Sequence, residues 1–424
     1  MNAATLPRSI PTLTLDRIEP FVLEENEAFF GDYFSIRINS AYQPIFSLAH
    51  RRAIGFEALA RPVGADGSPV PPRMVFGETR DDAENTFLDR LCRLVHARNF
   101  MAQADDTSWL FLNVDASVTA YGKSHGAFFG QMLERCRIPP YRVVVEILEG
   151  KIRDESLLVE AAQYYKEMGC LVAIDDFGAG HSNFERIWRI LPHIVKLDRS
   201  IVTQAAASRT VRRIVPNLVN LIHEAGSLVL MEGIETEEEA LIALDSDIDL
   251  VQGYYFARPS RLIPAHRHAI PHLDELCAQY KISSKKISCR HKQELHAYED
   301  AFEVFVKQYK AGSTPAKACS AFLGLPRADR CYVLDRDGRQ WGESFISPNA
   351  SMLSDPRFHP LSDSSDAIWA RRHYFRRAIG KPGEIQVSRP YLSIAGGNMC
   401  ITLSVAIFFG KEMVVLCGDL KWND

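Results

Sequence analysis

The stretch Leu171-Val-Ala-Ile-Asp-Asp-Phe-Gly178 places two adjacent carboxylates directly after four apolar residues. A short apolar run bounded by a glycine turn is typical of a buried strand, and Gly178 permits a sharp change of direction after it. Successive strand side chains point to opposite faces, so Asp175 and Asp176 reach one cavity only where the strand ends in a turn. Two neighbouring carboxylates repel unless one is protonated or a cation lies between them. The stretch therefore indicates either a divalent metal site or an N-cap for the next helix.

Other parts of the chain repeat this strand pattern. Eight short apolar runs precede residue 260, at 41–48, 53–59, 109–114, 143–147, 171–174, 194–197, 228–231 and 250–252. Segments with helical spacing separate most of them, for example at 82–100, 156–169, 211–225 and 236–245. Strand–helix repeats over about 250 residues predict an α/β fold, a TIM-like (β/α)8 barrel. Only four residues separate the first two runs, too few for a parallel crossover, so we expect an antiparallel first strand.

Polar side chains follow most of these runs. They are Glu57, Arg61, Asn113, Glu146, Glu149, Asp175, Asp176, Lys196, Asp198, Glu232, Glu235 and Gln252. The functional cavity of such barrels lies at the carboxyl ends of the strands, so we expect these side chains around a common rim. Any one of them can be a helix cap, but their recurrence at seven strand ends favours a binding site. Carboxylate and amide oxygens without histidine or thiolate suit Mg²⁺, Mn²⁺ or Ca²⁺ rather than zinc.

The number of oxygen ligands indicates the chemistry. Six oxygen-bearing side chains exceed what one octahedral ion with its waters takes, so two ions that share a carboxylate fit better. Such pairs of ions serve in-line displacement at phosphorus, and water between them is readily deprotonated. Lys196 is a candidate to hold that water, to help remove its proton or to offset the developing charge. Arg61 offers a planar fork of donors to phosphate oxygens. The residues thus indicate a two-metal phosphodiesterase or phosphatase.

The motif Glu57-Ala-Leu-Ala-Arg61 resembles the signature of the EAL-domain cyclic-di-GMP phosphodiesterases. Further motifs of that family occur in the family order, namely Tyr42-Gln-Pro-Ile45, Leu112-Asn-Val114, Glu146-Ile-Leu-Glu149, Asp175-Asp-Phe-Gly178, Lys196-Leu-Asp198, Glu232-Gly-Ile-Glu235 and Gln252-Gly-Tyr254 through Pro259. The resemblance covers roughly residues 25–265. It implies a barrel with a reversed first strand, and hydrolysis of one phosphodiester of cyclic di-GMP to linear pGpG.

The resemblance also implies roles for individual residues. Glu57, Asn113, Glu146 and Asp175 would hold one Mg²⁺ or Mn²⁺ ion, and Asp175, as a bridge, would hold the second together with Asp176 and Glu232. Calcium is expected to be inhibitory. Lys196 matches the general-base or water-activating lysine, Gln252 the residue that positions the water, and Glu235 a supporting acid. Gln43 and Arg61 match substrate-phosphate contacts. Glu149 resembles the acid that anchors the loop after Asp-Asp-Phe-Gly, and Asp198 would likewise support the ligand residues.

Two questions stay open under this resemblance. Some family members keep the ligands yet act chiefly as cyclic-di-GMP receptors, so an enzyme and a receptor that signals to a protein partner are both considered. We also expect a homodimer formed near the loop 178–184, because regulation in similar proteins runs through that loop. His181 in this loop is interpreted as a packing or interface residue rather than as a catalytic histidine.

Composition narrows the class of protein. The chain has 424 residues and a net charge of −4, which suggests no nucleic-acid surface. Its nine cysteines form no Cys-x-x-Cys pair and argue against a secreted disulfide framework. No apolar run approaches the roughly 18 residues of a membrane span. Residues 1–20 lack the pattern of a signal peptide and are predicted to be a loose tail. A cytoplasmic protein is the expectation.

The alternation of strand-like and helical segments ends after residue 265. We predict a barrel at 21–265, a helical linker at 266–311 and a second domain at 312–424. Strand-like runs at 331–334, 385–391, 400–408 and 414–420, with a helix near 369–379, predict an α+β domain with an antiparallel meander. The segment 388–404 resembles PAS- and Cache-like sensor domains, and the domain order resembles the YkuI type of EAL protein. The domain is predicted to bind an unknown small ligand or protein, or to serve dimerisation.

Overall fold

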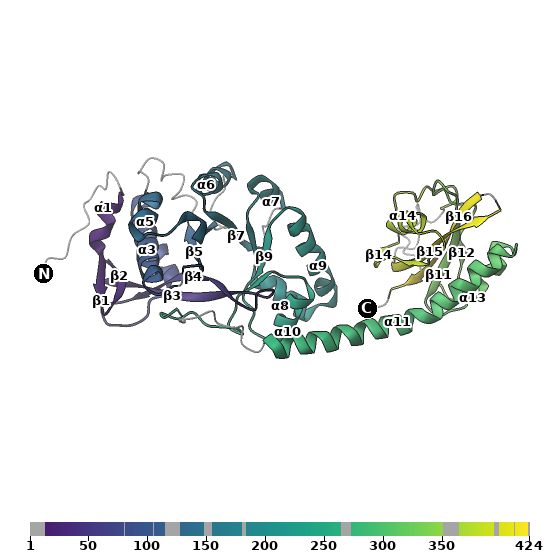
Figure 1. Ribbon diagram of the computed structural model, residues 1–424, viewed down its shortest axis with the longest axis horizontal. Coiled ribbons are helices and arrows are strands. Elements are labelled where there is room, and N and C mark those ends of the chain that lie inside the picture. The colour runs from purple at the N-terminus through teal and green to yellow at the C-terminus, as the bar shows by residue number, and fades with distance from the viewer. Residues whose placement is uncertain are drawn as a thin grey trace. The chain divides into compact units, whose positions relative to one another are not determined.

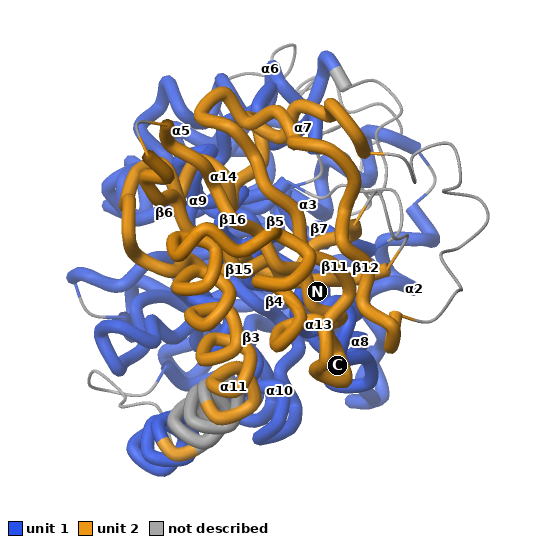
Figure 2. Tube along the Cα trace, turned by 90° about the vertical axis from the view of Figure 1, so that its right-hand side faces the viewer, with its two compact units in different colours: residues 1–281 blue, residues 282–424 orange. Residues whose placement is uncertain are grey.

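The structure is a computed structural model that describes residues 13–79, 81–104, 106–114, 128–147, 155–179, 184–263, 273–350, 364–393, 398–410 and 412–422. The chain divides into two compact units, residues 1–281 and 282–424, which Figure 2 shows in different colours.

A closed barrel forms the first unit. Its strands are β3 (Ile36–Ser47), β4 (Arg52–Val63), β5 (Trp109–Val114), β6 (Val143–Ile147), β7 (Leu171–Phe177), β8 (Ile194–Leu197), β9 (Leu228–Met231) and β10 (Leu250–Val251). The sheet runs β3-β10-β9-β8-β7-β6-β5-β4 and closes because β3 also pairs with β4 (Figure 1). Strand β3 is antiparallel to both neighbours, whereas the other barrel pairings are parallel. The TIM-like barrel with an antiparallel first strand is thus confirmed.

Helices follow the strands around the outside of the barrel. They are α2 (Pro72–Gly77), α3 (Asp82–Gln103), α5 (Phe128–Cys136), α6 (Glu155–Glu167), α7 (Phe184–Ile190), α8 (Arg199–Ala207), α9 (Arg209–Glu224) and α10 (Glu237–Asp245). Side-chain caps define several of their starts. Asp81 accepts from the backbone of Glu84 at the start of α3, and Thr236 with Glu239 forms a capping box on α10. All four segments with helical spacing therefore form helices.

The N-terminal segment differs from the prediction. Residues 13–20 are not part of a loose tail, since α1 (Leu15–Ile18) is followed by the 3-10 turn Glu19–Phe21 and by the hairpin β1 (Val22–Glu25) and β2 (Ala28–Tyr33). Leu13, Leu15 and Ile18 are buried in the barrel's outer core. Arg90 of α3 donates a hydrogen bond to the carbonyl oxygen of Leu13. Three apolar side chains in a mostly polar stretch are too few to show a periodicity, and their burial depends on the helix that they meet.

The second unit is built on an antiparallel sheet. Its strands are β11 (Ala328–Leu334), β12 (Phe345–Ile346), β13 (Gln386–Val387), β14 (Tyr391–Leu392), β15 (Met399–Phe409) and β16 (Glu412–Lys421). Their order is β12-β11-β16-β15-β13, and β14 pairs with β15. The run 385–391, predicted as one strand, forms parts of β13 and β14 instead. A smaller sheet domain after the barrel is confirmed, and the PAS- or Cache-like resemblance stays a prediction.

Helices pack on both faces of this sheet. Helix α11 (Leu273–Lys310) passes from the first unit into the second, where its Phe302 and Phe305 share a core with Phe322 of α13 (Ser320–Leu323). The short helix α12 (Pro315–Ala318) precedes α13. Helix α14 (His373–Gly380) packs on the other face through a separate core that includes Tyr332 (Figure 1). The predicted linker 266–311 therefore contains a helix that also contributes to the core of the second domain.

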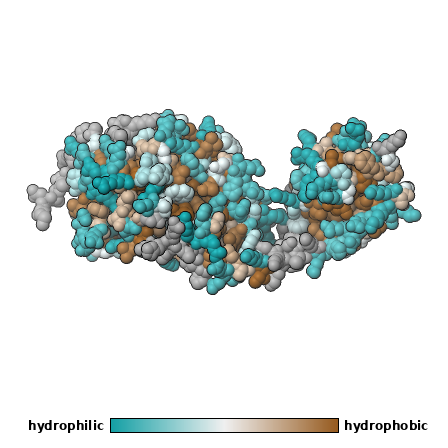
Figure 3. Space-filling view, in the orientation of Figure 1, coloured by the Kyte–Doolittle hydropathy of each residue, from teal (hydrophilic) through white to brown (hydrophobic). Residues whose placement is uncertain are grey.

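The surface carries both polar and apolar residues. On the face seen in Figure 3, hydrophilic side chains surround smaller hydrophobic areas on both units. Among the described residues, no helix combines the length and the apolar character that crossing a membrane requires.

Candidate active site

The barrel strands place the predicted ligands in one layer. A layer of apolar side chains fills the barrel interior, and it consists of Ile45, Phe111, Val144, Ala173, Ile194, Leu230 and Leu250. Side chains two residues apart on a strand share a face. Counting two residues onward from six members of this layer gives Asn113, Glu146, Asp175, Lys196, Glu232 and Gln252. The polar residues thus form the next layer, toward the carboxyl ends of the parallel strands, as predicted.

Glu57 follows the same rule from β4. The residue two positions before it is Gly55, and a Cβ atom there would lie 2.8 Å from Cε2 of Phe111. The glycine therefore leaves room for the phenylalanine ring in the apolar layer, while Glu57 points into the polar layer.

The end of β7 explains how adjacent aspartates serve one site. The pairing of β7 with β8 shifts register between Ile174 and Phe177, and Asp176 has a φ of 54°, in the left-handed region. This break in the alternation lets Asp175, Asp176 and Glu232 bring carboxylate oxygens within 4.8 Å of one another. Gly178 has a φ of 105°, and a Cβ atom there would lie 2.4 Å from Cδ1 of Ile201. A side chain at this position would therefore be strained, which favours glycine in the turn.

Lys196 lies at the centre of the acidic layer. Its Nζ atom is 2.6 Å from Oε1 of Glu146, 2.6 Å from Oε1 of Glu232 and 2.9 Å from Oδ1 of Asp175. Glu57 is more distant, with Oε1 4.0 Å from Nζ. The lysine side chain is 1% exposed and that of Glu146 is 0% exposed. One ammonium group therefore neutralises only part of a buried cluster of carboxylates.

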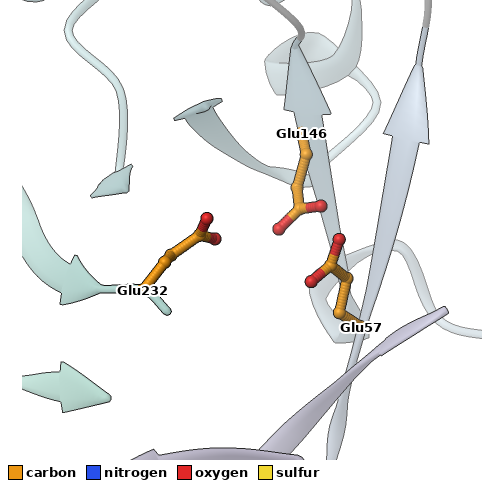
Figure 4. Close-up of side chains that lie close together, drawn as sticks. All are labelled: Glu57, Glu146 and Glu232. Atoms are coloured by element: carbon orange, nitrogen blue, oxygen red, sulfur yellow. The ribbon is translucent and has the colours of Figure 1, made fainter. Parts of the chain in front are cut away.

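Amide side chains orient Glu57 within this cluster. Nδ2 of Asn113 donates to Oε1 of Glu57 at 3.0 Å, and Nε2 of Gln252 donates to Oε2 at 2.7 Å. Figure 4 shows that the carboxyl groups of Glu57, Glu146 and Glu232 point toward one another. These three groups also have oxygens within 4.8 Å of one another.

Burial and mutual repulsion shift the protonation of the cluster. Burial, with Glu57 nearby, raises the pKa of Glu146 well above its ordinary value. Burial raises the pKa of Glu232 to about 8, although Lys196 opposes this shift. Burial opposes the charge of Lys196, but the surrounding carboxylates, Asp175 first, raise the pKa of Lys196 well above its ordinary value. The site is electrostatically short of positive charge.

The residues fit divalent cations. Two overlapping groups of three carboxylates are present, Glu57–Glu146–Glu232 and Asp175–Asp176–Glu232. Oε2 of Glu146 and Oε1 of Gln252 are buried and have no hydrogen-bond partner among the described residues. Buried oxygens of this kind require a partner, and oxygen-only donor sets suit Mg²⁺, Mn²⁺ or Ca²⁺. The resemblance assigned Asp175 as the shared ligand, whereas Glu232 is common to the two groups here.

Several predicted residues make their contacts outside this cluster. Oε2 of Glu235 is 2.7 Å from Nη2 of Arg199, and Asp198 caps α8 by accepting from the backbone of Ser200 at 2.9 Å. Nη1 of Arg61 donates to the carbonyl oxygen of Ala60 at 2.9 Å. Their assigned roles, and the supporting role of Glu149, stay predictions. Glu149 and His181 lie outside the described residues.

Gln43 lies beside the cluster, and Arg199 is a neighbour that sequence reasoning missed. Gln43 pairs with Glu57 in the β3–β4 register, and its Nε2 donates to the carbonyl oxygen of Ala257 at 3.2 Å. The signal for Arg199 was its position directly after Asp198, at the start of α8. Its Nη2 atom donates to Oε2 of Glu235, which lies in the segment between β9 and α10.

Comparison with known families agrees with this geometry. The family model described as EAL domain matches residues 35–259, more than half of the chain. The chain belongs to the EAL family. Its matched region spans the barrel from β3 to the segment after β10, and it includes every described residue of the carboxylate cluster.

Curated relatives of this EAL protein include two informative examples. Cyclic di-GMP phosphodiesterase RocR of Pseudomonas aeruginosa is 28% identical over 257 residues, which are 60% of this chain and 63% of RocR. The uncharacterized EAL-domain containing protein YkuI of Bacillus subtilis is 23% identical over 402 residues, 90% of this chain and 94% of YkuI. The chain thus spans less than two thirds of RocR but nearly all of YkuI. Named relatives place the EAL family among hydrolases.

A solved structure extends the likeness to both domains. The crystal structure of Bacillus subtilis YkuI, in complex with cyclic di-GMP and calcium, matches with a TM-score of 0.75 and 22% identity. The match covers 91% of this chain and 97% of that chain. At this identity the likeness establishes the fold, which is an EAL barrel followed by a smaller sheet domain.

Proposed function

We propose that this chain is a metal-dependent phosphodiesterase that hydrolyses cyclic di-GMP to linear pGpG and is regulated by its C-terminal domain. The observation that carries the proposal is the meeting of Glu57, Glu146, Asp175 and Glu232 around Lys196. Relatives that are named cyclic di-GMP phosphodiesterases, RocR among them, support the choice of substrate.

The residues of the cluster have separate tasks in this reaction. Two divalent cations, Mg²⁺ or Mn²⁺, would polarise the phosphodiester and supply an activated water nucleophile. Glu57, Asn113, Glu146, Asp175, Asp176 and Glu232 would hold them. Lys196 would hold the attacking water through its ammonium group and offset the developing charge, and Gln252 would orient that water. Gln43 and Arg61 would bind substrate phosphate, with Glu235, Glu149 and Asp198 in support.

Turnover by purified full-length protein tests the proposal. Cyclic di-GMP is incubated with Mg²⁺ or Mn²⁺, and the linear product is separated by liquid chromatography. We expect product with either ion, none in EDTA, and substrate binding with little turnover in Ca²⁺. Glu57→Ala and Lys196→Ala should abolish product, whereas Glu237→Gln, an exposed position at the start of α10, should not. Intact substrate with wild-type protein under every metal would contradict the enzymatic proposal.

A receptor that binds cyclic di-GMP without hydrolysing it is the second candidate. The observation in its favour is that three carboxylates hold the ammonium group of Lys196, the residue assigned to the attacking water. Tight binding of cyclic di-GMP, measured by calorimetry in Ca²⁺ and in Mg²⁺, without any linear product would establish this function.

Dimerisation near the loop 178–184 remains part of the proposal. Helix α7, which begins at Phe184, and the residue after it expose Trp188 and Leu191, two large apolar side chains next to this loop. Light scattering of wild-type protein should give the mass of two chains, and Trp188→Glu should reduce it to one. A monomer at working concentration in the wild type would contradict it.

A further inference from the structure

The second unit contains a cavity that has no part in the chemistry of the barrel. Its volume is about 520 Å³, and its lining includes Arg372, His373, Arg377, Ser388, Arg389 and Tyr391. The first three lie at the start of α14 and along it, and the others lie on and between β13 and β14. We call it the arginine cavity. Cavities of about 300–1,000 Å³ are the size that small ligands occupy.

The lining of the arginine cavity is strongly basic. Three guanidinium groups and an imidazole line it, and no acidic side chain among the described residues does. The segment 369–391 contains five arginines and one lysine against a single acid, Glu384. Oε2 of Glu384 lies 3.6 Å from Nζ of Lys381. Like charges gathered in a concavity repel one another, so the site favours an anion that neutralises them.

Neighbouring groups hold two of the arginines in position. Nη1 of Arg377 donates to the carbonyl oxygen of Val387 at 3.1 Å, which ties α14 to β13. The guanidinium carbon of Arg372 lies 5.9 Å from the ring centroid of Trp369 and 5.7 Å from that of Tyr391. Guanidinium groups stacked on aromatic rings keep their edges available for hydrogen bonds. The arginine cavity is thus built on a helix and a sheet rather than on surface side chains alone.

The buried acid Asp419 is kept apart from the arginine cavity. Asp419 lies in a smaller neighbouring cavity, and Arg372, Tyr374 and Tyr391 line both. The Oγ1 atom of Thr402 donates to Oδ1 of Asp419 at 2.7 Å and lies 2.6 Å from the hydroxyl oxygen of Tyr391. Asp419 thus accepts hydrogen bonds from Thr402 and Tyr332 and does not itself line the arginine cavity.

We propose that the arginine cavity binds a small molecule that carries a phosphate or diphosphate group. A phosphate offers three acceptor oxygens and close to two negative charges, whereas a carboxylate offers two oxygens and one charge. Arginine forks bind such oxygens in pairs of parallel hydrogen bonds. Three guanidinium groups that line one cavity match the oxygens and charge of a phosphate or diphosphate better than those of a single carboxylate. The arginine cavity lies in the second unit and shares no residue with the carboxylate cluster of the barrel, so binding there is tested independently of hydrolysis.

Calorimetric titration of the full-length protein with inorganic pyrophosphate tests the assignment. Divalent metal is removed with a chelating resin before the titration, so that the barrel cluster offers pyrophosphate carboxylates and the buried ammonium group of Lys196 but no metal ion. We expect saturable binding of one pyrophosphate per chain, weakened by added salt. Arg389→Gln and Arg377→Gln should each weaken it about tenfold or more, as the loss of a charge-assisted hydrogen bond does. Arg376→Gln is the matched control, because Arg376 is an exposed neighbour of Arg377 on α14 outside the cavity.

The outcomes separate the possibilities. Loss of affinity in Arg389→Gln with wild-type affinity in Arg376→Gln supports the proposal, and the fold of Arg389→Gln is checked by its melting temperature without ligand. An absence of pyrophosphate binding overturns it. Equal weakening by all three substitutions also overturns it, because it indicates unspecific attraction to a basic surface. Tighter binding of citrate than of pyrophosphate would assign the cavity to polycarboxylates instead.

Discussion

The ammonium group of Lys196 lies 2.6 Å from Oε1 of Glu146, and both side chains are almost completely buried. A buried ion pair is expensive to desolvate and is retained where charge has a task. Here the lysine faces more carboxylates than it can neutralise, and this imbalance leads to the first two predictions.

Glu146→Gln should weaken metal binding without destabilising the metal-free protein. The amide keeps the shape of the side chain and removes one buried negative charge, while Lys196 keeps Asp175 and Glu232 as partners. We expect the melting temperature in EDTA to stay equal or rise. Affinity for Mn²⁺ should fall by at least the roughly 10–100-fold that supporting residues of metal sites contribute. Calorimetry and thermal melts check both, and a lower melting temperature in EDTA would contradict the charge argument.

Lys196→Met should destabilise the metal-free barrel. It removes the only cation in contact with this cluster among the described residues and leaves buried carboxylates unpaired, at a cost of about 3–5 kcal/mol. Urea unfolding in EDTA measures the loss. Added Mg²⁺ should restore part of the stability, because a cation then replaces the ammonium charge. Equal loss with and without Mg²⁺ would count against a cation site.

Gly178→Ala tests the turn after the aspartate pair. Alanine at a positive φ costs about 1–2 kcal/mol, and its Cβ atom would also overlap Ile201, so the total loss should exceed that range. Gly226→Ala is the matched control, because Gly226 has a φ of 86° and open space around it. Denaturant unfolding should show the larger loss at position 178, accompanied by weaker metal binding. Equal losses at both positions would mean that the contact with Ile201 is easily relieved.

Asp419 should make the second unit more stable in acid than at neutral pH. Burial raises the pKa of Asp419 to about 7, partly opposed by its hydrogen bond from Thr402. A carboxyl whose folded-state pKa is raised contributes stability that is complete below its unfolded pKa near 4 and is lost as pH rises through about 7. The slope is about 1.4 kcal/mol per pH unit between these values.

Asp419→Asn isolates this contribution from other titrating groups. Unfolding of the second unit is followed at pH 5, 6, 7 and 8 with and without the Asp419→Asn substitution. The signal is the fluorescence of Trp341, Trp369 and Trp422, after Trp109 and Trp188 of the barrel have been replaced by phenylalanine in both proteins. The difference in unfolding free energy between them should grow in favour of the variant as pH rises. A difference that is constant across this range would refute the raised pKa.

The alternation of strands and helices in the first unit could be predicted from the sequence alone. Buried parallel strands appear in the sequence as short apolar runs, whereas the helices between them have apolar residues at helical spacing. Each pattern can therefore be recognised within a short stretch of the sequence. The four-residue connection before Ala53 excludes a parallel crossover and determined the reversed first strand. A polar residue at each strand end, such as Asn113 or Gln252, likewise predicted the rim of the cavity, because the carboxyl ends of barrel strands meet there.

Contacts across the barrel were decided only by the tertiary structure. Lys196 lies among the carboxylates because of the register of the barrel strands and the closure of the barrel. The spacing of residues within one strand does not encode either of these. The ion pair between Glu235 and Arg199 likewise joins two segments that are far apart in the sequence. The arginine cavity arises because α14 packs beside strands that follow it in the chain. The spacing of apolar residues in the sequence indicates which side of its own helix or strand each residue lies on. The distance between two charged groups, by contrast, is set by how separate helices and strands pack together.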